Sequence, residues 1–275
     1  MVCLTFDLEE RFHSHLTPSN SPREWNLHNS ITRIIDWLEE HNKKATFFIV
    51  GELAEHYPHL IQRIFQAGCE IASHSYQHIR FDETRVEFCK EDISKSKKVL
   101  EDIIGSPVYG FRSPSWSVKI ADNWFWDYLI SLGFCYDSSL FPFRTHMYGS
   151  FKNQPKPFWI RSEILEIPPS VHLIGPIRIP YGGGFYFRFY PTFLTKYFID
   201  YNINAGRIPI LYFHPWDFES APDFLERSYL NRFIGNYNVK KAWKKFDVLL
   251  DGLKTITAHK YLIRILNKSS SREDE

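Results

Sequence analysis

Residues 2–10 read Val-Cys-Leu-Thr-Phe-Asp-Leu-Glu-Glu, an apolar run that ends in acidic side chains. A parallel strand that is buried on both faces has this composition. Asp7 and Glu9 are two residues apart, so an extended chain points them to the same side. The stretch therefore predicts a buried strand that delivers Asp7, Glu9 and Glu10 to a functional site. A solvated acidic turn or a helix cap is the alternative interpretation of these carboxylates.

The first strand begins a pattern that repeats along the chain. Apolar residues at helical spacing in 31–38 precede a second apolar run at 45–50. Further strands are expected at 69–73, 108–111, 134–136 and 208–213, and further helices at about 60–68, 84–104, 121–132 and 237–257. Alternating strands and helices predict a parallel sheet covered by helices, which closes into an α/β barrel. The functional side chains of such a barrel lie at the C-terminal ends of its strands.

A chain of 275 residues is long for one domain, but single α/β barrels reach this length. We expect one catalytic domain over residues 1–266. Residues 149–207 are rich in proline, aromatic side chains and short apolar runs, which predicts an elaborated insertion. The glycines at 182–184 allow the backbone to approach a glycan closely, or they form a tight turn. The polar residues 267–275 predict a disordered tail.

Composition limits the classes of function. The 33 Lys and Arg residues balance 32 Asp and Glu residues, which excludes a nucleic-acid binder that relies on net charge. Aromatic residues make up 17% of the chain, and they suit sugar rings as well as a core. Four widely spaced cysteines predict neither a zinc knuckle nor a disulfide framework. The N-terminus lacks the features of a signal peptide, so we expect a cytoplasmic protein.

Residues 74–78 read His-Ser-Tyr-Gln-His and directly follow a predicted strand. One turn of helix would bring the two imidazoles to the same side, within reach of one metal ion. Histidine pairs at this spacing are common by chance in a chain with 12 histidines. A carboxylate at the end of another strand strengthens the metal interpretation, because two histidines and one carboxylate form a familiar catalytic metal site.

Five ordered segments of the chain resemble the motifs of NodB-type polysaccharide deacetylases, which form carbohydrate esterase family four. These segments are residues 5–10, 74–78, 111–116, 136–139 and 211–215. Residues 180–184 and 214–216 further resemble the branch with a C-terminal extension that is linked to bacterial exopolysaccharide and exosortase systems. The resemblance implies a distorted (β/α)7-type barrel, the NodB homology fold, with a C-terminal elaboration. It also implies that the protein uses a divalent metal ion to remove acetyl groups from sugars.

The resemblance implies that His74 and His78 are metal ligands and that Asp7 is the general base. Family members commonly place an aspartate directly after the base, where this chain has Leu8. Related branches place the acidic ligand two residues after the base, which favours Glu9, and Glu10 is the alternative. Zn²⁺ is the expected ion, although such a ligand set also accepts cobalt, nickel or manganese.

By the same resemblance, Arg112 pairs with Asp7 and keeps it ionised, and a structural salt bridge is the alternative role. The backbone N–H of Ser115 is the expected second contact for the oxyanion. Trp116 and Trp216 are expected to wall the acetyl pocket or the sugar groove, unless they are ordinary core aromatics.

His214 is the expected general acid, which protonates the departing sugar nitrogen. Asp137 is expected to orient it and to favour its imidazolium form. The alternative for Asp137 is an Asx turn with the two serines that follow it.

The leading hypothesis is a metal-dependent N-deacetylase. Its expected substrate is an N-acetylated sugar in a bacterial surface polysaccharide or its precursor, including a membrane-associated, lipid-linked precursor. One alternative is a hydrolase of a small-molecule amide on the same fold. The other is an inactive glycan-binding protein, although binding alone does not require an acid and a base.

Overall fold

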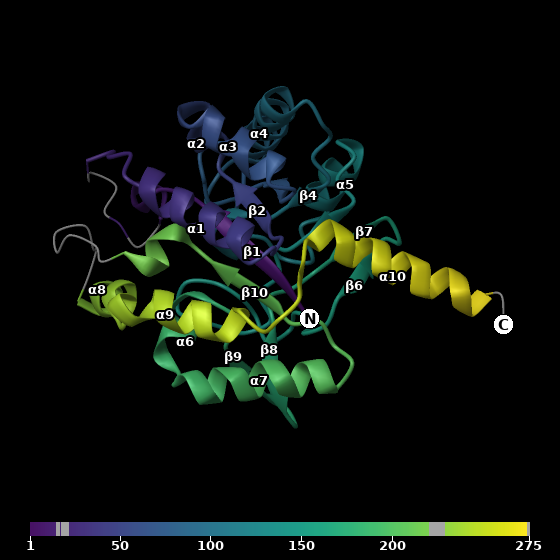
Figure 1. Ribbon diagram of the computed structural model, residues 1–275. Helices are drawn as coiled ribbons and strands as arrows, with labels where there is room; N and C mark the ends of the chain where they lie inside the picture. Colours follow the sequence, from purple (N-terminus) through teal and green to yellow (C-terminus); the bar gives the residue numbers. More distant parts are fainter. Residues whose placement is uncertain (15–16, 18–21, 220–228, 274–275) are drawn as a thin grey trace.

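A curled parallel sheet forms the centre of the protein. The computed structural model describes residues 1–14, 17, 22–219 and 229–273. In the described part, seven parallel strands follow one another in the order β10-β1-β2-β3-β4-β5-β7 (Figure 1). They are β1 (Val2–Leu8), β2 (Thr46–Ile49), β3 (Glu70–Ser73), β4 (Gly110–Phe111), β5 (Tyr136–Asp137), β7 (Ile164–Glu166) and β10 (Ile210–Phe213). The expected α/β fold is confirmed, with the sheet curled into a half-barrel.

Helices cover the outside of this sheet. Those that connect the first strands are α1 (His28–Glu40), α2 (Gly51–His56), α3 (Pro58–Gln66), α4 (Val86–Ile104) and α5 (Asn123–Ser131). The second half of the chain adds α6 (Gly184–Phe189), α7 (Thr192–Asn204), α8 (Tyr229–Asn236), α9 (Val239–Leu250) and α10 (Ala258–Glu273). Figure 1 shows α10 crossing the barrel and extending beyond it.

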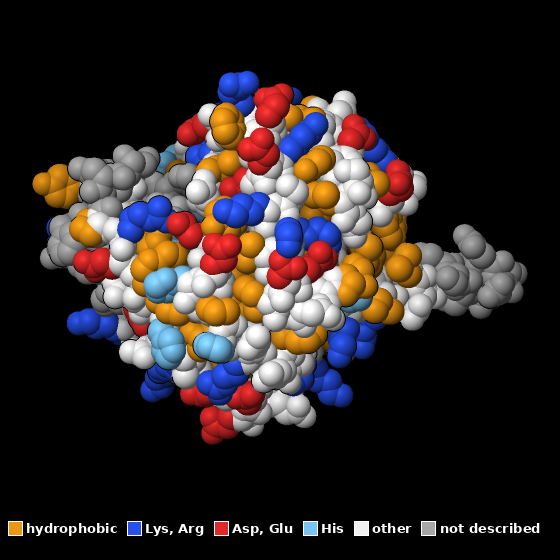
Figure 2. Space-filling model, turned by 90° about the horizontal axis from the view of Figure 1, so that it is seen from above, with side chains coloured by type: hydrophobic (Ala, Val, Ile, Leu, Met, Phe, Trp, Pro, Cys, Tyr) orange, Lys and Arg blue, Asp and Glu red, His pale blue; other side chains and the backbone are white. Residues whose placement is uncertain are grey.

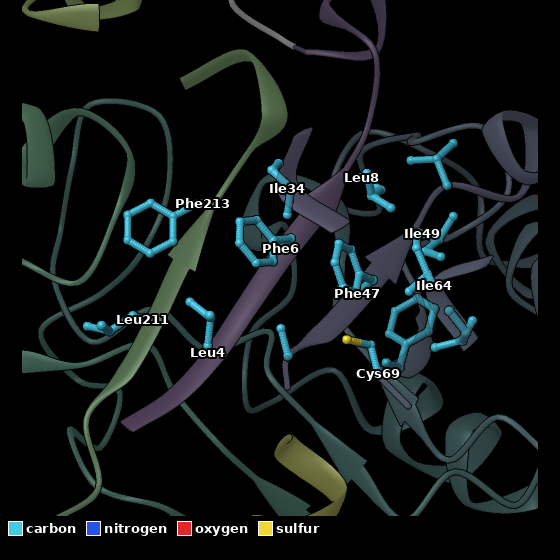
Figure 3. Packing of buried hydrophobic residues seen from close by; sticks show 14 of the residues in the cluster. Leu4, Phe6, Leu8, Ile34, Phe47, Ile49, Ile64, Cys69, Leu211 and Phe213 are labelled. Atoms are coloured by element: carbon cyan, nitrogen blue, oxygen red, sulfur yellow. The ribbon is translucent and has the colours of Figure 1, made fainter. Parts of the chain in front are cut away.

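Successive side chains of β1 serve two different layers. Leu4, Phe6 and Leu8 point outward and join the core between the sheet and the helices, where they meet Phe47 and Phe213 (Figure 3). The alternate residues of β1 point inward. The inner side is apolar near the N-terminal ends of the strands, where Cys3 lies, and polar near their C-terminal ends, where Asp7 lies. The C-terminal ends of the strands can therefore hold a site.

The curled sheet is joined between β7 and β10 by irregular chain instead of a regular strand. The backbone N–H of Ser170 donates to Ile210 O at 3.1 Å, and that of Tyr212 donates to Gly182 O at 2.8 Å. A Cβ atom on Gly183 would lie 1.7 Å from Tyr212 O. The glycine run therefore allows two backbones of the protein to approach each other, in the region where a glycan contact or a turn was expected.

Smaller strands complete the fold. An antiparallel strand, β6 (Phe158–Ile160), extends the sheet beyond β7, and β11 (Thr255–Ile256) pairs in parallel with the start of β1. A separate hairpin contains β8 (Val171–Ile174) and β9 (Ile177–Pro180). Short 3-10 turns occupy Arg11–His13, Pro114–Trp116 and Pro215–Phe218.

Three expectations about the second half need correction. The segment 149–207 is more than an insertion, because it contributes β7 to the parallel sheet. The single helix expected at 237–257 is α9 followed by β11. The tail expected to be disordered from residue 267 continues α10 through Glu273, and residues 274–275 lie outside the described residues.

The surface carries no large field of one sign on the face seen in Figure 2, where acidic and basic side chains intermingle. This distribution agrees with the formal net charge of +1. Among the described residues, the helices are too short or too polar to cross a membrane.

Candidate active site

Most of the polar residues singled out in the sequence gather in one pocket at the C-terminal ends of the strands. This pocket has a volume of about 190 Å³. Asp7 and Glu9 reach it from the end of β1, His74 from β3, Arg112 from β4 and His214 from β10. Each strand ends at the same edge of the sheet, so residues far apart in sequence lie side by side.

Glu9, His74 and His78 form a compact cluster in the floor of the pocket. One ligand atom from each residue lies within 4.8 Å of the other two, and all three side chains are buried. Glu9 forms an ion pair with Nε2 of His78. Burial alone would raise the pKa of Glu9, but His78, with help from His214 and His74, holds it well below its usual range. Two imidazoles and an ionised carboxylate fit a divalent metal ion of the zinc type.

His74 is oriented by the backbone of the next strand. Its Nδ1 lies 2.7 Å from Arg112 O and donates to it, because a carbonyl oxygen only accepts. This bond leaves the lone pair of Nε2 free to face the cluster. Burial, the largest influence, lowers the pKa of His74 to about 4. The ring is therefore neutral near pH 7, which is the form that binds a metal ion.

The segment 74–78 is a turn and not the expected turn of helix. Ser75 and His78 both adopt positive φ angles, of 64° and 57°. Asp92 on α4 holds this conformation, because its carboxylate accepts the backbone N–H groups of Tyr76 at 2.7 Å and Gln77 at 2.9 Å. The imidazole rings of His74 and His78 still lie 4.9 Å apart. Sequence reasoning missed Asp92, which resembles any other acidic residue of an amphipathic helix.

Glu10 faces away from the cluster. One of its carboxylate oxygens accepts the backbone N–H groups of Asn26 at 2.9 Å and Leu27 at 3.0 Å, directly before α1. Burial, the largest influence, raises the pKa of Glu10 to about 7. Of the two acidic residues that the sequence left open, the structure brings Glu9 to the histidines and gives Glu10 the position of a helix cap.

Asp7 and Arg112 form a buried ion pair beside the cluster. Nη1 of Arg112 donates to Oδ1 of Asp7 at 2.5 Å and lies 3.2 Å from the hydroxyl of Thr5. Nη2 donates to the hydroxyl of Ser138 at 2.8 Å, and the guanidinium lies over the ring of Phe48. The arginine is fully enclosed, so it holds one oxygen of Asp7 in a fixed position and leaves the other directed into the pocket.

His214 lies opposite Asp7. Its Nε2 is 3.8 Å from Oδ2 of Asp7 and 3.7 Å from Oε1 of Glu9. Its Nδ1 lies 3.1 Å from Oδ2 of Asp217 and donates to it. Burial opposes protonation, but the hydrogen bond and charge of Asp217, with Glu9 and Asp7, raise the pKa of His214 above its ordinary value. The imidazole can therefore supply a proton on the side that faces the pocket.

The expectation that Asp137 orients His214 is wrong. Asp137 pairs in the sheet with Phe111, whose side chain belongs to the outer core, so strand parity points both away from the inner side. Its carboxylate accepts the backbone N–H and the hydroxyl of Ser139, at 2.7 and 2.8 Å. This is the Asx turn that the sequence left as the alternative. Asp217 takes the orienting position, and its only signal in the sequence is its place three residues after His214.

The two tryptophans singled out in the sequence, Trp116 and Trp216, both line the pocket. Trp116 packs against Phe141, Tyr148 and Tyr212 in the pocket wall. Trp216 stacks on the imidazole of His214, with ring centroids 4.2 Å apart. Among the described residues, the indole N–H groups of both tryptophans are buried without a hydrogen-bond partner. Other atoms of the two side chains line the pocket.

Ser115 lines the same pocket in a left-handed backbone conformation, with φ of 51°. Trp116 also has positive φ, of 48°. Two consecutive residues in this region are costly outside glycine, and such strain concentrates at functional sites. Ser115 therefore lies at the pocket in a strained turn, and its role as an oxyanion contact stays a prediction.

Known families match both halves of the chain. Residues 1–134 match the polysaccharide deacetylase family, and residues 138–262 match a domain of unknown function (DUF3473). A peptidoglycan-N-acetylglucosamine deacetylase of Bacillus cereus is 34% identical over 82 residues, which cover 30% of each chain. A chitooligosaccharide deacetylase of Azorhizobium caulinodans is 34% identical over 97 residues, which cover 34% of this chain and 46% of the relative. The alignments thus span less than half of either relative.

The fold has a counterpart among solved structures. A Mycobacterium smegmatis protein described as a polysaccharide deacetylase superposes with a TM-score of 0.64 at 19% identity, covering 98% of this chain and 90% of that chain. At this identity the superposition shows a shared fold. The two family matches assign residues 1–134 to the polysaccharide deacetylase family and residues 138–262 to the DUF3473 family.

Proposed function

We propose that this protein is a metal-dependent hydrolase that removes N-acetyl groups from amino sugars. Its proposed substrate is a bacterial surface polysaccharide or a membrane-associated precursor of one. The observation that carries the proposal is the joint placement of three groups in one pocket: the buried Asp7–Arg112 pair, the cluster of Glu9, His74 and His78, and His214. Binding alone would not require an acid and a base that face each other.

The donor set of the cluster fits Zn²⁺ or a similar divalent ion. Such an ion, when bound, lowers the pKa of a coordinated water molecule and polarises the acetyl carbonyl. Glu9, His74 and His78 would hold it. His74 is preset for this role by its bond to the Arg112 carbonyl, which keeps the other ring nitrogen directed at the cluster.

The protein's own residues would handle the protons. Asp7 is the proposed general base, because one of its oxygens is fixed by Arg112 and the other faces the pocket. His214 is the proposed general acid and would protonate the sugar nitrogen as the carbon–nitrogen bond breaks. The backbone of Ser115 would contact the carbonyl oxygen as negative charge develops there.

The pocket walls agree with a sugar substrate. Trp116 and Trp216 offer apolar aromatic surface in the pocket wall, which suits an acetyl group and the face of a sugar ring. The named relatives act on peptidoglycan N-acetylglucosamine and on chitooligosaccharides. These substrates define the class of N-acetylated sugars to be tried first.

Acetate release tests this proposal. The protein, stripped of metal and reloaded with Zn²⁺, Co²⁺, Ni²⁺ or Mn²⁺, is incubated with chitooligosaccharides, peptidoglycan fragments and lipid-linked or nucleotide-linked N-acetylglucosamine. We expect metal-dependent acetate release that disappears in Asp7→Asn. A folded, metal-loaded protein that releases no acetate from any of these substrates contradicts the proposal. Turnover of only a small amide would assign the site to that alternative.

A further inference from the structure

Three linked residues at the wall of the pocket belong to the half of the chain that matches a domain of unknown function. They are Arg188 at the end of α6, Asp217 in the turn after β10, and His214. We infer that Arg188 and Asp217 are positioning residues that fix the direction and tautomer of His214. The DUF3473 half would then complete the catalytic apparatus of the deacetylase half. This inference rests on the proposed function, in which His214 is the general acid.

Asp217 is placed by the turn that follows β10. Its Oδ2 accepts two hydrogen bonds from His214, one from the backbone N–H at 2.9 Å and one from Nδ1 at 3.1 Å. Its Oδ1 accepts Nε of Arg188 at 3.2 Å. The aspartate is 1% exposed, so water does not replace these partners. Its carboxylate is thus shared between the histidine and the arginine.

Arg188 is itself fixed on all sides. Nη1 donates to Gly235 O at 3.1 Å and to Tyr237 O at 2.8 Å, and Nη2 donates to Ile234 O at 3.0 Å. These carbonyls stand at the C-terminal end of α8, where helix carbonyls lack internal partners and attract positive charge. Arg188 is 3% exposed and bridges α6, α8 and the turn that carries Asp217. A group held in this way cannot follow the imidazole if it moves.

The consequence for His214 is a defined ring orientation. A carboxylate only accepts, so Nδ1 must carry a hydrogen and Nε2 is the nitrogen that exchanges a proton with the pocket. Trp216 covers one face of the ring and limits its rotation. The residue that family resemblance suggested for this task, Asp137, bonds with Ser139 on the other side of the sheet. Arg188 and Asp217 therefore provide the support that Asp137 does not.

Two substrates with different leaving groups distinguish positioning of the acid from general damage. A chitooligosaccharide needs a proton on the departing nitrogen, whereas 4-nitrophenyl acetate expels a stable phenolate without one. In Asp217→Asn, we expect turnover of the amide to fall by about 10²-fold or more and turnover of the ester by less than about 10-fold. Arg188→Lys should change the ratio in the same direction by a smaller factor. An unchanged ratio in Asp217→Asn overturns the inference.

Asp137→Asn is the matched control, since it removes a buried carboxylate of the same turn-forming type. Any loss it causes should affect both substrates equally, and metal content should stay that of the unaltered protein in all three variants. A nuclear magnetic resonance measurement tests the geometry without turnover. The Nδ1–H resonance of His214 should be protected from exchange in the unaltered protein and lost in Asp217→Ala, which has no side-chain acceptor.

These two readouts separate the two proposals. If the unaltered protein hydrolyses neither substrate, the proposed function fails, and the resonance still decides whether Asp217 fixes the ring. If the protein is active but the resonance is unchanged in Asp217→Ala and the substrate ratio is unchanged in Asp217→Asn, the positioning inference fails and the deacetylase proposal stands.

Discussion

His214 Nε2 lies 3.8 Å from Asp7 Oδ2, and the two residues follow directly on a paired position of neighbouring strands, Phe6 with Phe213. The register of β1 against β10 thus brings the proposed base and the proposed acid to the same height. Each is held from behind by an arginine, Arg112 for Asp7 and Arg188 through Asp217 for His214. The proposed acid and base are therefore held in place by the ends of two adjacent strands.

Replacement of Glu9 should remove the metal site. In Glu9→Gln, we expect the bound metal to fall well below one ion per chain, because a neutral amide oxygen is a poor substitute for a carboxylate ligand. His74→Ala and His78→Ala should have the same effect. Metal content after dialysis, measured by atomic emission, checks this. Glu10→Gln is the control and should keep its metal, since Glu10 faces α1.

Asp7→Asn should abolish most of the turnover and leave metal binding intact. The amide oxygen still accepts the hydrogen bond from Arg112, but it does not take up a proton near neutral pH. We expect turnover to fall by about 10²–10⁴-fold. Rates with the metal-loaded variant and its metal content give the answer. Turnover equal to that of the unaltered protein would show that another group acts as the base.

Glu10 should make the stability depend on pH. Its pKa is about 7 in the folded chain and near 4.5 in the unfolded chain, so the folded protein keeps a proton that the unfolded chain has lost between these values. The free energy of unfolding should therefore fall as the pH rises from about 4.5 to 7, by on the order of 1–3 kcal/mol.

Glu10→Gln isolates this contribution, because the amide oxygen still accepts the two N–H groups before α1 but does not titrate. Urea unfolding at several pH values should show a flatter pH dependence in the variant. Parallel curves for the two proteins would show that Glu10 titrates normally.

Gly183→Ala should destabilise the contact between Gly183 and β10, where irregular chain joins the two ends of the curled sheet. The added Cβ would lie 1.7 Å from Tyr212 O, a backbone atom of a buried strand, so the chain must shift. We expect a loss of about 1–3 kcal/mol in the free energy of unfolding. Gly252→Ala is the control, because no atom lies within 4 Å of its added Cβ. Equal unfolding curves for both variants would contradict the close packing at Gly183.

Much of the fold could be predicted from local patterns. The apolar run of residues 2–6 and the helical spacing in 31–38 are short-range signals, and β1 and α1 are found there. The expected strand parity of Asp7 and Glu9 also agrees with their joint entry into the pocket. The place of β7 in the parallel sheet was missed, because Ile164–Glu166 is too short for a clear period and lies among prolines and aromatic residues.

The supporting residues of the site depend on tertiary contacts that leave little trace in the sequence. Arg188 and Asp217 are 29 residues apart and meet only when α6 packs on the end of β10. Asp92 supports the turn at 74–78 from a helix that begins eight residues later. Asp137 was misplaced because the sequence motif does not reveal to which face of β5 its side chain points.

The central place of β1 also affects how the chain acquires its structure during synthesis. One edge of β1 pairs with β2, which follows within fifty residues, whereas the other edge pairs with β10 (Ile210–Phe213), about two hundred residues further on. Until the ribosome has delivered β10, that edge exposes unpaired backbone groups, which attract other strands. The nascent chain should therefore need protection by chaperones for most of its synthesis, and its two halves should not fold well when expressed apart.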